Sequence, residues 1–173
     1  PEELIPQFSL AREYLTAHNI TWYEVEGFEG DDIIGTLVDF GEKNNLKVSV
    51  YTGDKDAFQL ISPQTTIYRT VKGVTELDIY NEQTLLDKYG LKPDQIRDFL
   101  GLMGDTADNI PGIKGIGEKT ALKLLHQYET IEGLEEHQNE LKGKMGEKIR
   151  AGMEDALMSK KVATILRDVP LDV

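Results

Sequence analysis

The sequence of 173 residues contains no cysteine, a single tryptophan and no long run of apolar residues. The absence of cysteine excludes disulfide bonds, thiolate metal sites and cysteine nucleophiles, and it fits a reducing compartment. No segment approaches the ~20 apolar residues that a membrane-spanning helix needs. With 39% hydrophobic residues, a chain of this length can nevertheless build a core of its own.

Basic residues are also scarce, at 19 against 31 acidic ones, and the imbalance lies in one part of the chain. Residues 1–110 carry 9 basic and 20 acidic side chains, whereas residues 111–173 carry 10 and 11. A net charge of −12 argues against general phosphate binding, which draws on Lys and Arg. A solvated acidic surface is the ordinary explanation of such an excess. The positions of the carboxylates therefore decide whether they form a solvated acidic surface or a functional site.

The apolar pattern predicts an α/β arrangement followed by helices. The predicted elements are a first helix with an apolar stripe at Leu4, Phe8, Ala11 and Leu15, a strand over 20–25, a helix over 31–42, a strand from Leu46 to Thr52, a short helix over 55–61, a strand pair over 67–77 turning at Lys72 and Gly73, and a helix over 82–89. Strand, helix and strand with short joins form a parallel α/β unit. From Pro93 onward the pattern is helical only, so we expect an α/β domain over 1–109 and a helical subdomain over 110–173.

Seven carboxylates stand out by their positions. They are Glu29, Asp31, Asp32, Asp54, Asp56, Asp105 and Asp108. The first three lie between the first predicted strand and the helix after it, and the next two follow the carboxyl end of the next strand, the edge where open parallel sheets bind ligands. The last two are three residues apart, so a helical turn would point both the same way.

If the sheet brings these segments together, the seven carboxylates share one rim. Like charges that close raise one another's pKa and oppose folding unless cations neutralise them. Oxygen ligands without cysteine, and with the three histidines scattered elsewhere, select hard cations such as Mg²⁺ or Mn²⁺. Each group alone is explained by a helix cap, a turn or a solvated helix end. Three such groups together favour a metal site.

The stretch from Ile110 to Leu125 is rich in glycine and lysine and predicts a helix-hairpin-helix that binds phosphate. Its glycines permit a tight hairpin, and free N–H groups at the start of the following helix favour an anion. The residues expected to contact phosphate are Lys114, Gly115, Gly117, Lys119, Thr120 and Lys123. The alternative is a glycine-rich turn that only packs two helices. Lys160 and Lys161 are expected on a solvated helix face.

These motifs, in this order and spacing, resemble the 5′ nuclease (flap endonuclease-like) family, in particular the 5′→3′ exonuclease domains of bacterial DNA polymerases I. The resemblance implies a PIN-like domain with two divalent metals, Mg²⁺ or Mn²⁺, and a hairpin that also binds K⁺ through its carbonyls. It implies two-metal phosphodiester hydrolysis at the 5′ ends and flaps of duplex DNA in replication and repair, by a monomer in the bacterial cytoplasm and nucleoid. By the same resemblance, Glu29 and Asp31 belong to the first metal site and Asp54, Asp56 and Asp108 to the second, with Asp32 and Asp105 beside them.

The sequence departs from the family pattern at its beginning. Family members start with a strand bearing an Asp, a helical arch, basic residues and a second Asp, all before the helix with which this sequence opens. The first metal site would therefore be incomplete, and we interpret the sequence as a nuclease fragment whose activity in isolation is open. Two alternatives remain, a non-catalytic module that binds duplex DNA and a PIN-like ribonuclease. Cleavage of 5′-flap DNA compared with single-stranded RNA separates them.

Overall fold

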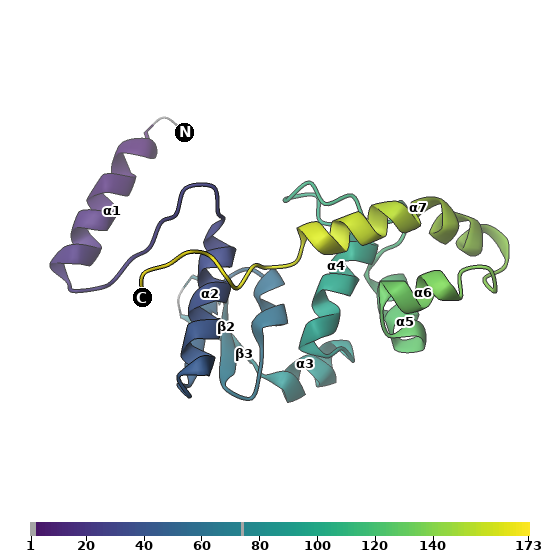
Figure 1. The fold of residues 1–173 in the computed structure, drawn as a ribbon, viewed down its shortest axis with the longest axis horizontal. Coiled ribbons are helices and arrows are strands. Elements are labelled where there is room, and N and C mark those ends of the chain that lie inside the picture. The colour runs from purple at the N-terminus through teal and green to yellow at the C-terminus, as the bar shows by residue number, and fades with distance from the viewer. Residues whose placement is uncertain (1–2, 74) are drawn as a thin grey trace.

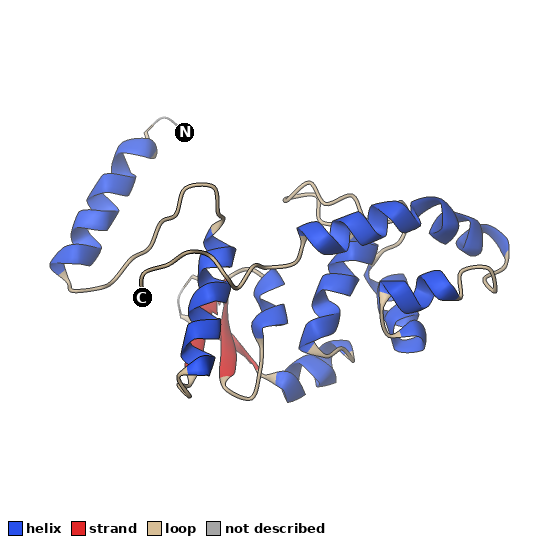
Figure 2. Cartoon of the chain, viewed as in Figure 1, coloured by secondary structure: helices blue, strands red, loops and turns tan. Residues whose placement is uncertain are grey.

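The computed structural model describes residues 3–73 and 75–173, which form a small sheet with helices around it (Figure 1, Figure 2). Strands β1 (Val48–Thr52), β2 (Thr65–Lys72) and β3 (Glu76–Tyr80) lie in this order in one sheet. β1 and β2 are parallel, and β2 and β3 are antiparallel. Within the described residues, no helix has the length and apolar character needed to cross a membrane.

Helices make up most of the remaining chain. In chain order they are α1 (Ile5–Ala17), α2 (Gly30–Lys43), η1 (Asp56–Leu60), α3 (Glu82–Tyr89), η2 (Pro93–Gln95), α4 (Ile96–Met103), α5 (Glu118–Tyr128), α6 (Ile131–Glu136) and α7 (Gly143–Val162), where η denotes a 3-10 helix. The predicted helix over 31–42 is α2, the predicted strand that follows it is β1, and the predicted strand pair is β2 with β3. α3 ends where predicted, because Gly90 takes a left-handed conformation with φ 65°.

The predicted strand over 20–25 is wrong. This segment forms no strand, and its Ile20 and Trp22 side chains are 50% and 41% exposed. Its side chains contact α1, where the Trp22 ring N–H donates to the Thr16 hydroxyl at 3.1 Å and Arg12 pairs with Glu24. A strand needs a neighbour for its backbone groups, and the described residues place none beside this segment. The parallel unit of the fold is therefore β1, η1 and β2.

The first helix forms as predicted, but its apolar stripe is not covered. No residue of α1 is buried, and Phe8 and Tyr14 are 53% and 63% exposed. Figure 1 shows α1 standing apart from the sheet and joined to α2 by an extended segment. Helical spacing thus identified the helix correctly without identifying what packs against it.

A single cluster of buried apolar side chains runs from the sheet to the last helix. Val50, Ile67 and Tyr80 lie in register across the three strands and are all buried. α4 packs against α5 and α7, so Leu102 and Ile149 join the same cluster. The expected boundary between residues 109 and 110 stays a prediction, because the buried cluster continues across it.

Candidate active site

The N-terminus of α2 carries the first three of the predicted carboxylates. Glu29 is the cap residue of the helix, and it forms a reciprocal capping box with Asp32. Asp32 also accepts a hydrogen bond at 2.9 Å from the Leu166 N–H, which ties the C-terminal segment to α2. Asp31 lies between them and is half-buried, and burial followed by the nearby carboxylates, Asp54 first, raises its pKa. The Asp32 carboxylate therefore stabilises the fold through its hydrogen bonds. The Asp31 carboxylate accepts no hydrogen bond from the described residues.

The turn after β1 carries the next two carboxylates. The Thr52 hydroxyl accepts from the Asp54 N–H, and an Asp54 carboxylate oxygen accepts from the Asp56 N–H at 2.9 Å. Asp56 opens η1 and is only 9% exposed. Its burial, with the charges of Asp54 and Asp108 next in importance, raises its pKa to about 7. The carboxylate of Asp56 thus sits where a positive charge would stabilise it.

Asp105 and Asp108 lie in a tight loop after α4 and not on the predicted helical turn. Asp105 and Ile110 exchange backbone hydrogen bonds of 2.9 and 2.7 Å, which close the loop as a short β-bridge. Asp105 also accepts from the Ala107 N–H at 2.7 Å, and Asn109 has a positive φ of 56°. These bonds fix the loop that carries Asp108, whose side chain is exposed.

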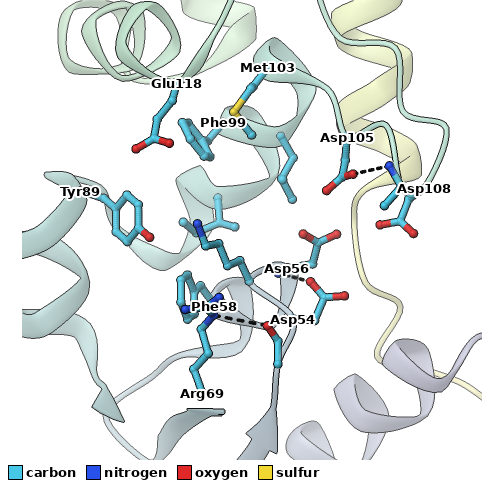
Figure 3. A pocket seen from close by; sticks show the side chains of 15 residues that line it. Asp54, Asp56, Phe58, Arg69, Tyr89, Phe99, Met103, Asp105, Asp108 and Glu118 are labelled. Carbon is cyan, nitrogen blue, oxygen red and sulfur yellow. Dashed lines mark hydrogen bonds between the residues drawn. The ribbon is translucent and has the colours of Figure 1, made fainter. Parts of the chain in front are cut away.

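The three segments meet at two adjoining hollows. The first, of about 340 Å³, is lined by every predicted carboxylate except Asp105. The second, of about 480 Å³, is lined by Asp105 and shares Asp54, Asp56 and Asp108 with the first (Figure 3). Among the described residues, no three such side chains stand close enough together to hold one metal ion. The seven carboxylates thus line two adjoining hollows. Because no three of them stand close enough for one ion, their role as metal ligands stays a prediction.

The predicted hairpin connects α4 to α5 and is fixed from both sides. The Ile113 N–H donates to the Leu102 carbonyl at 2.9 Å, and the Gly112 N–H donates to the Ser159 hydroxyl of α7 at 3.0 Å. Gly112 is required here because its φ is +57° and a methyl group would lie 2.3 Å from the Gly104 nitrogen. The hairpin is thereby held in one conformation against α4 and α7.

The outer side of the hairpin is open to solvent. Gly117 caps α5, and the N–H groups of Glu118 and Lys119 donate to no acceptor among the described residues. The side chains predicted to contact DNA are exposed apart from Thr120, which is half-buried. These include Lys114, Lys119 and Lys123. The arrangement has the free donors and positive charge of an anion site.

Two further residues border these sites without having been predicted. A methyl group on Gly115 would lie 2.9 Å from the Lys148 Nζ, so this cation of α7 stands directly beside the hairpin. Glu118 lines the larger hollow from the start of α5. The helical spacing of Ile149 and its buried neighbours could have placed Lys148 on α7. It could not have said which segment Lys148 faces.

Comparison with protein families gives matches over the whole chain. Residues 1–90 match the model "5'-3' exonuclease, N-terminal resolvase-like domain", and residues 91–173 match "5'-3' exonuclease, C-terminal SAM fold". DNA polymerase I of Bacillus subtilis is 48% identical over 174 residues, covering 100% of this chain and 20% of the relative. DNA polymerase I of Bacillus caldotenax is 49% identical with the same coverage. The chain thus spans about a fifth of the length of these relatives.

Solved structures share the fold at low sequence identity. The zinc-bound structure of T5 5′-exonuclease matches with a TM-score of 0.79 at 18% identity, over 94% of this chain and 59% of that one. The catalytic core of Rad2 in complex with a DNA substrate matches with a TM-score of 0.63 at 17% identity, over 98% and 60%. These likenesses agree with the predicted α/β and helical parts, and the family models cover both. The chain belongs to the 5′-3′ exonuclease family.

Proposed function

We propose that this chain carries the metal-binding and DNA-binding parts of a 5′→3′ exonuclease and 5′-flap endonuclease. The observation that supports this most is the meeting of carboxylates from α2, the turn after β1 and the loop after α4 at one hollow. A solvated acidic surface would spread such charges apart, because each raises the pKa of the others. The pKa of Asp56 is raised to about 7, by its burial first and then by the charges of Asp54 and Asp108, so a cation beside it would stabilise its charged form.

The donor set fits hard divalent cations. All the groups that line the smaller hollow with a titratable side chain are carboxylates, which suit Mg²⁺ or Mn²⁺. Following the family resemblance, Glu29 and Asp31 would hold the first ion. Asp54, Asp56 and Asp108 would hold the second, for which these three side chains would have to move closer together than they stand in the described residues. Asp32 and Asp105, which bind backbone N–H groups, would position these ligands.

The chain's own groups define the rest of the chemistry. When bound, divalent cations supply an activated water and stabilise charge on the leaving oxygen of a phosphodiester. The hairpin binds the DNA backbone through the Glu118 and Lys119 N–H groups and the lysines beside them. Backbone contacts carry no base information, so recognition follows DNA structure and not sequence. We also propose a K⁺ ion at the hairpin carbonyls, and a cytoplasmic, nucleoid-associated location that follows from a DNA partner.

The names of the relatives agree with this proposal. The T5 structure is described as binding zinc, and the Rad2 core as a complex with DNA substrate. The curated relatives are DNA polymerases I, so we propose that the chain acts next to a polymerase domain.

Cleavage by the purified chain tests the proposal directly. We expect Mg²⁺- or Mn²⁺-dependent release of the 5′ strand from a flap duplex, suppressed by EDTA and lost in the double variant Asp54→Asn with Asp56→Asn. The double variant Glu154→Gln with Asp155→Asn, which removes the same charge from exposed positions on α7, serves as the control. Weak metal binding and no cleavage of any substrate, even when the N-terminal strand and helical arch of the family are restored, would favour a non-catalytic module that binds duplex DNA. Preferential cleavage of single-stranded RNA would favour a PIN-like ribonuclease.

A further inference from the structure

The larger hollow has one acidic side and one apolar side (Figure 3). Its volume of about 480 Å³ lies in the range of small-molecule sites. The apolar side is made by Phe58 of η1, Tyr89 at the end of α3, and Phe99 and Met103 of α4. Figure 3 shows Tyr89 across the cavity from Asp105 and Asp108. The predicted nuclease chemistry uses the carboxylates and assigns no function to the residues of the apolar side.

Tyr89 and Met103 give the aromatic side a surface that a flat ring can contact, and Phe58 and Phe99, which are 2% and 8% exposed, support it from behind. The Phe58 and Tyr89 rings have centroids 6.1 Å apart and planes at 52° to each other. Tyr89 and Met103 are only half-buried, so parts of both side chains are open to the cavity. Aromatic rings and thioethers both make favourable contacts with other aromatic groups.

Two cations also line this cavity. Lys55 and Arg69 have no carboxylate partner within 4.0 Å in the part of the chain that the structure describes. The Arg69 Nε donates to the Gly53 carbonyl at 3.3 Å, which leaves the other guanidinium N–H groups for a ligand. The cavity thus offers donors as well as an apolar face.

We propose that this cavity receives the base of the nucleotide whose phosphate lies at the carboxylates. This inference rests on the proposed function, which makes the ligand a DNA strand. It adds a binding site for the base of one nucleotide of that strand. Asp54, Asp56, Ala107 and Asp108 line both hollows, so a phosphate in the acidic hollow is next to the aromatic cavity. Stacking tolerates every base because each has a π-face, which agrees with recognition that ignores sequence.

Binding of an uncharged nucleoside tests this without metal and without cleavage. In EDTA, 2′-deoxyadenosine is expected to shift the amide NMR signals of Tyr89 and Phe99, whereas 2-deoxyribose, which lacks the base, leaves them in place. Equal shifts from both probes, or shifts confined to the hairpin, would overturn the proposal. Because the probe has no phosphodiester, this result is independent of whether the chain is a nuclease.

Substitutions of the cavity wall sharpen the test. Tyr89→Ala is expected to weaken nucleoside binding roughly tenfold, and Tyr89→Phe to retain it. Tyr128→Ala removes another half-buried tyrosine that does not line the cavity, and it is the matched control. Ala107→Trp, at an exposed position on the rim, should block binding without changing the core. Unchanged affinity in the folded Tyr89→Ala or Ala107→Trp variant would refute the assignment.

Discussion

The Lys160 ammonium group of α7 lies 2.7 Å from a carboxylate oxygen of Asp98 on α4. Both side chains are nearly withdrawn from solvent, at 14% and 2% exposure. The same Asp98 carboxylate accepts from the Ile131 N–H at 2.9 Å, and Lys160 also pairs with Glu132. This network joins α4, α6 and α7, and so holds together the helices behind the hairpin. Lys160 is therefore not on a solvated face as expected, and only Lys161 is.

Removing one partner of this pair should leave a buried charge unpaired. We expect Lys160→Met to lower the free energy of unfolding by about 3–5 kcal/mol, because the Asp98 carboxylate would lose its cation. Urea unfolding at pH 7 measures the change. Lys161→Met, at the exposed neighbouring position, should stay within about 0.5 kcal/mol of the parent chain. A Lys160→Met variant as stable as the Lys161→Met variant would show that the pair is unimportant.

The contrast between Lys160 and Lys161 shows what sequence patterns could and could not predict. Local signals were sufficient for α2, for β1 and for the end of α3 at Gly90, because spacing and turn chemistry act within a few residues. The partner of Lys160 lies 62 positions earlier, and no local pattern identifies it. The strand predicted over 20–25 failed for the same reason, since a strand is defined by its neighbours.

The candidate site was predictable to a similar extent. The strand end after Thr52 and the helix start after Glu29 could be recognised, so the carboxylates beside them were found. Lys148 was missed because it reaches the hairpin from a helix that begins 28 residues after Gly115. The aromatic side of the larger hollow was missed because Phe58, Tyr89 and Phe99 come from three separate elements.

The raised pKa of Asp56 predicts how stability without metal depends on pH. Its folded value is about 7 against about 3.9 for an unfolded Asp, so the folded state binds the proton more tightly. The stabilisation is complete below about pH 4 and is lost as the pH rises to about 7. In EDTA, we expect the free energy of unfolding to fall by roughly 2–4 kcal/mol over this range. Asp56→Asn should make the free energy of unfolding less dependent on pH. If urea unfolding gave the same pH profile for this variant and the parent chain, Asp56 would not be the group responsible.

Divalent cations should reverse this penalty. Binding to the folded state at 100 times the dissociation constant contributes about 2.7 kcal/mol, which corresponds to roughly 5–10 °C in Tm for a chain of this size. We expect Mn²⁺ or Mg²⁺ to raise Tm in the parent chain and in the double variant Glu154→Gln with Asp155→Asn. The double variant Asp54→Asn with Asp56→Asn should show no such shift. A Tm that stays constant through a Mn²⁺ titration of the parent chain would count against a competent site.

The hairpin glycines differ in what they tolerate. Gly112→Ala combines a φ of +57° with a methyl group 2.3 Å from the Gly104 nitrogen, so the loop must move. We expect a loss of at least 2 kcal/mol, an order-of-magnitude value for such strain. Gly117→Ala is the control, because its φ is −105° and no atom lies within 4 Å of the added methyl group. It should cost under about 1 kcal/mol, and equal losses for the two variants in thermal unfolding would contradict the described hairpin.

The hairpin, and not the acidic hollow, should supply the DNA affinity of the chain. Lys119 and Lys123 are exposed on the first turns of α5 and the Lys148 Nζ lies beside Gly115, whereas the carboxylates repel phosphate unless cations neutralise them. Replacing each lysine by Ala should reduce the slope of log affinity against log salt by about one unit for duplex DNA, with little change in sequence preference. Lys161→Ala is the control, since Lys160 is engaged by Asp98 and Glu132. If fluorescence anisotropy gave the same loss of slope for Lys161→Ala, binding would be diffuse attraction to positive charge and the hairpin would have no special part in it.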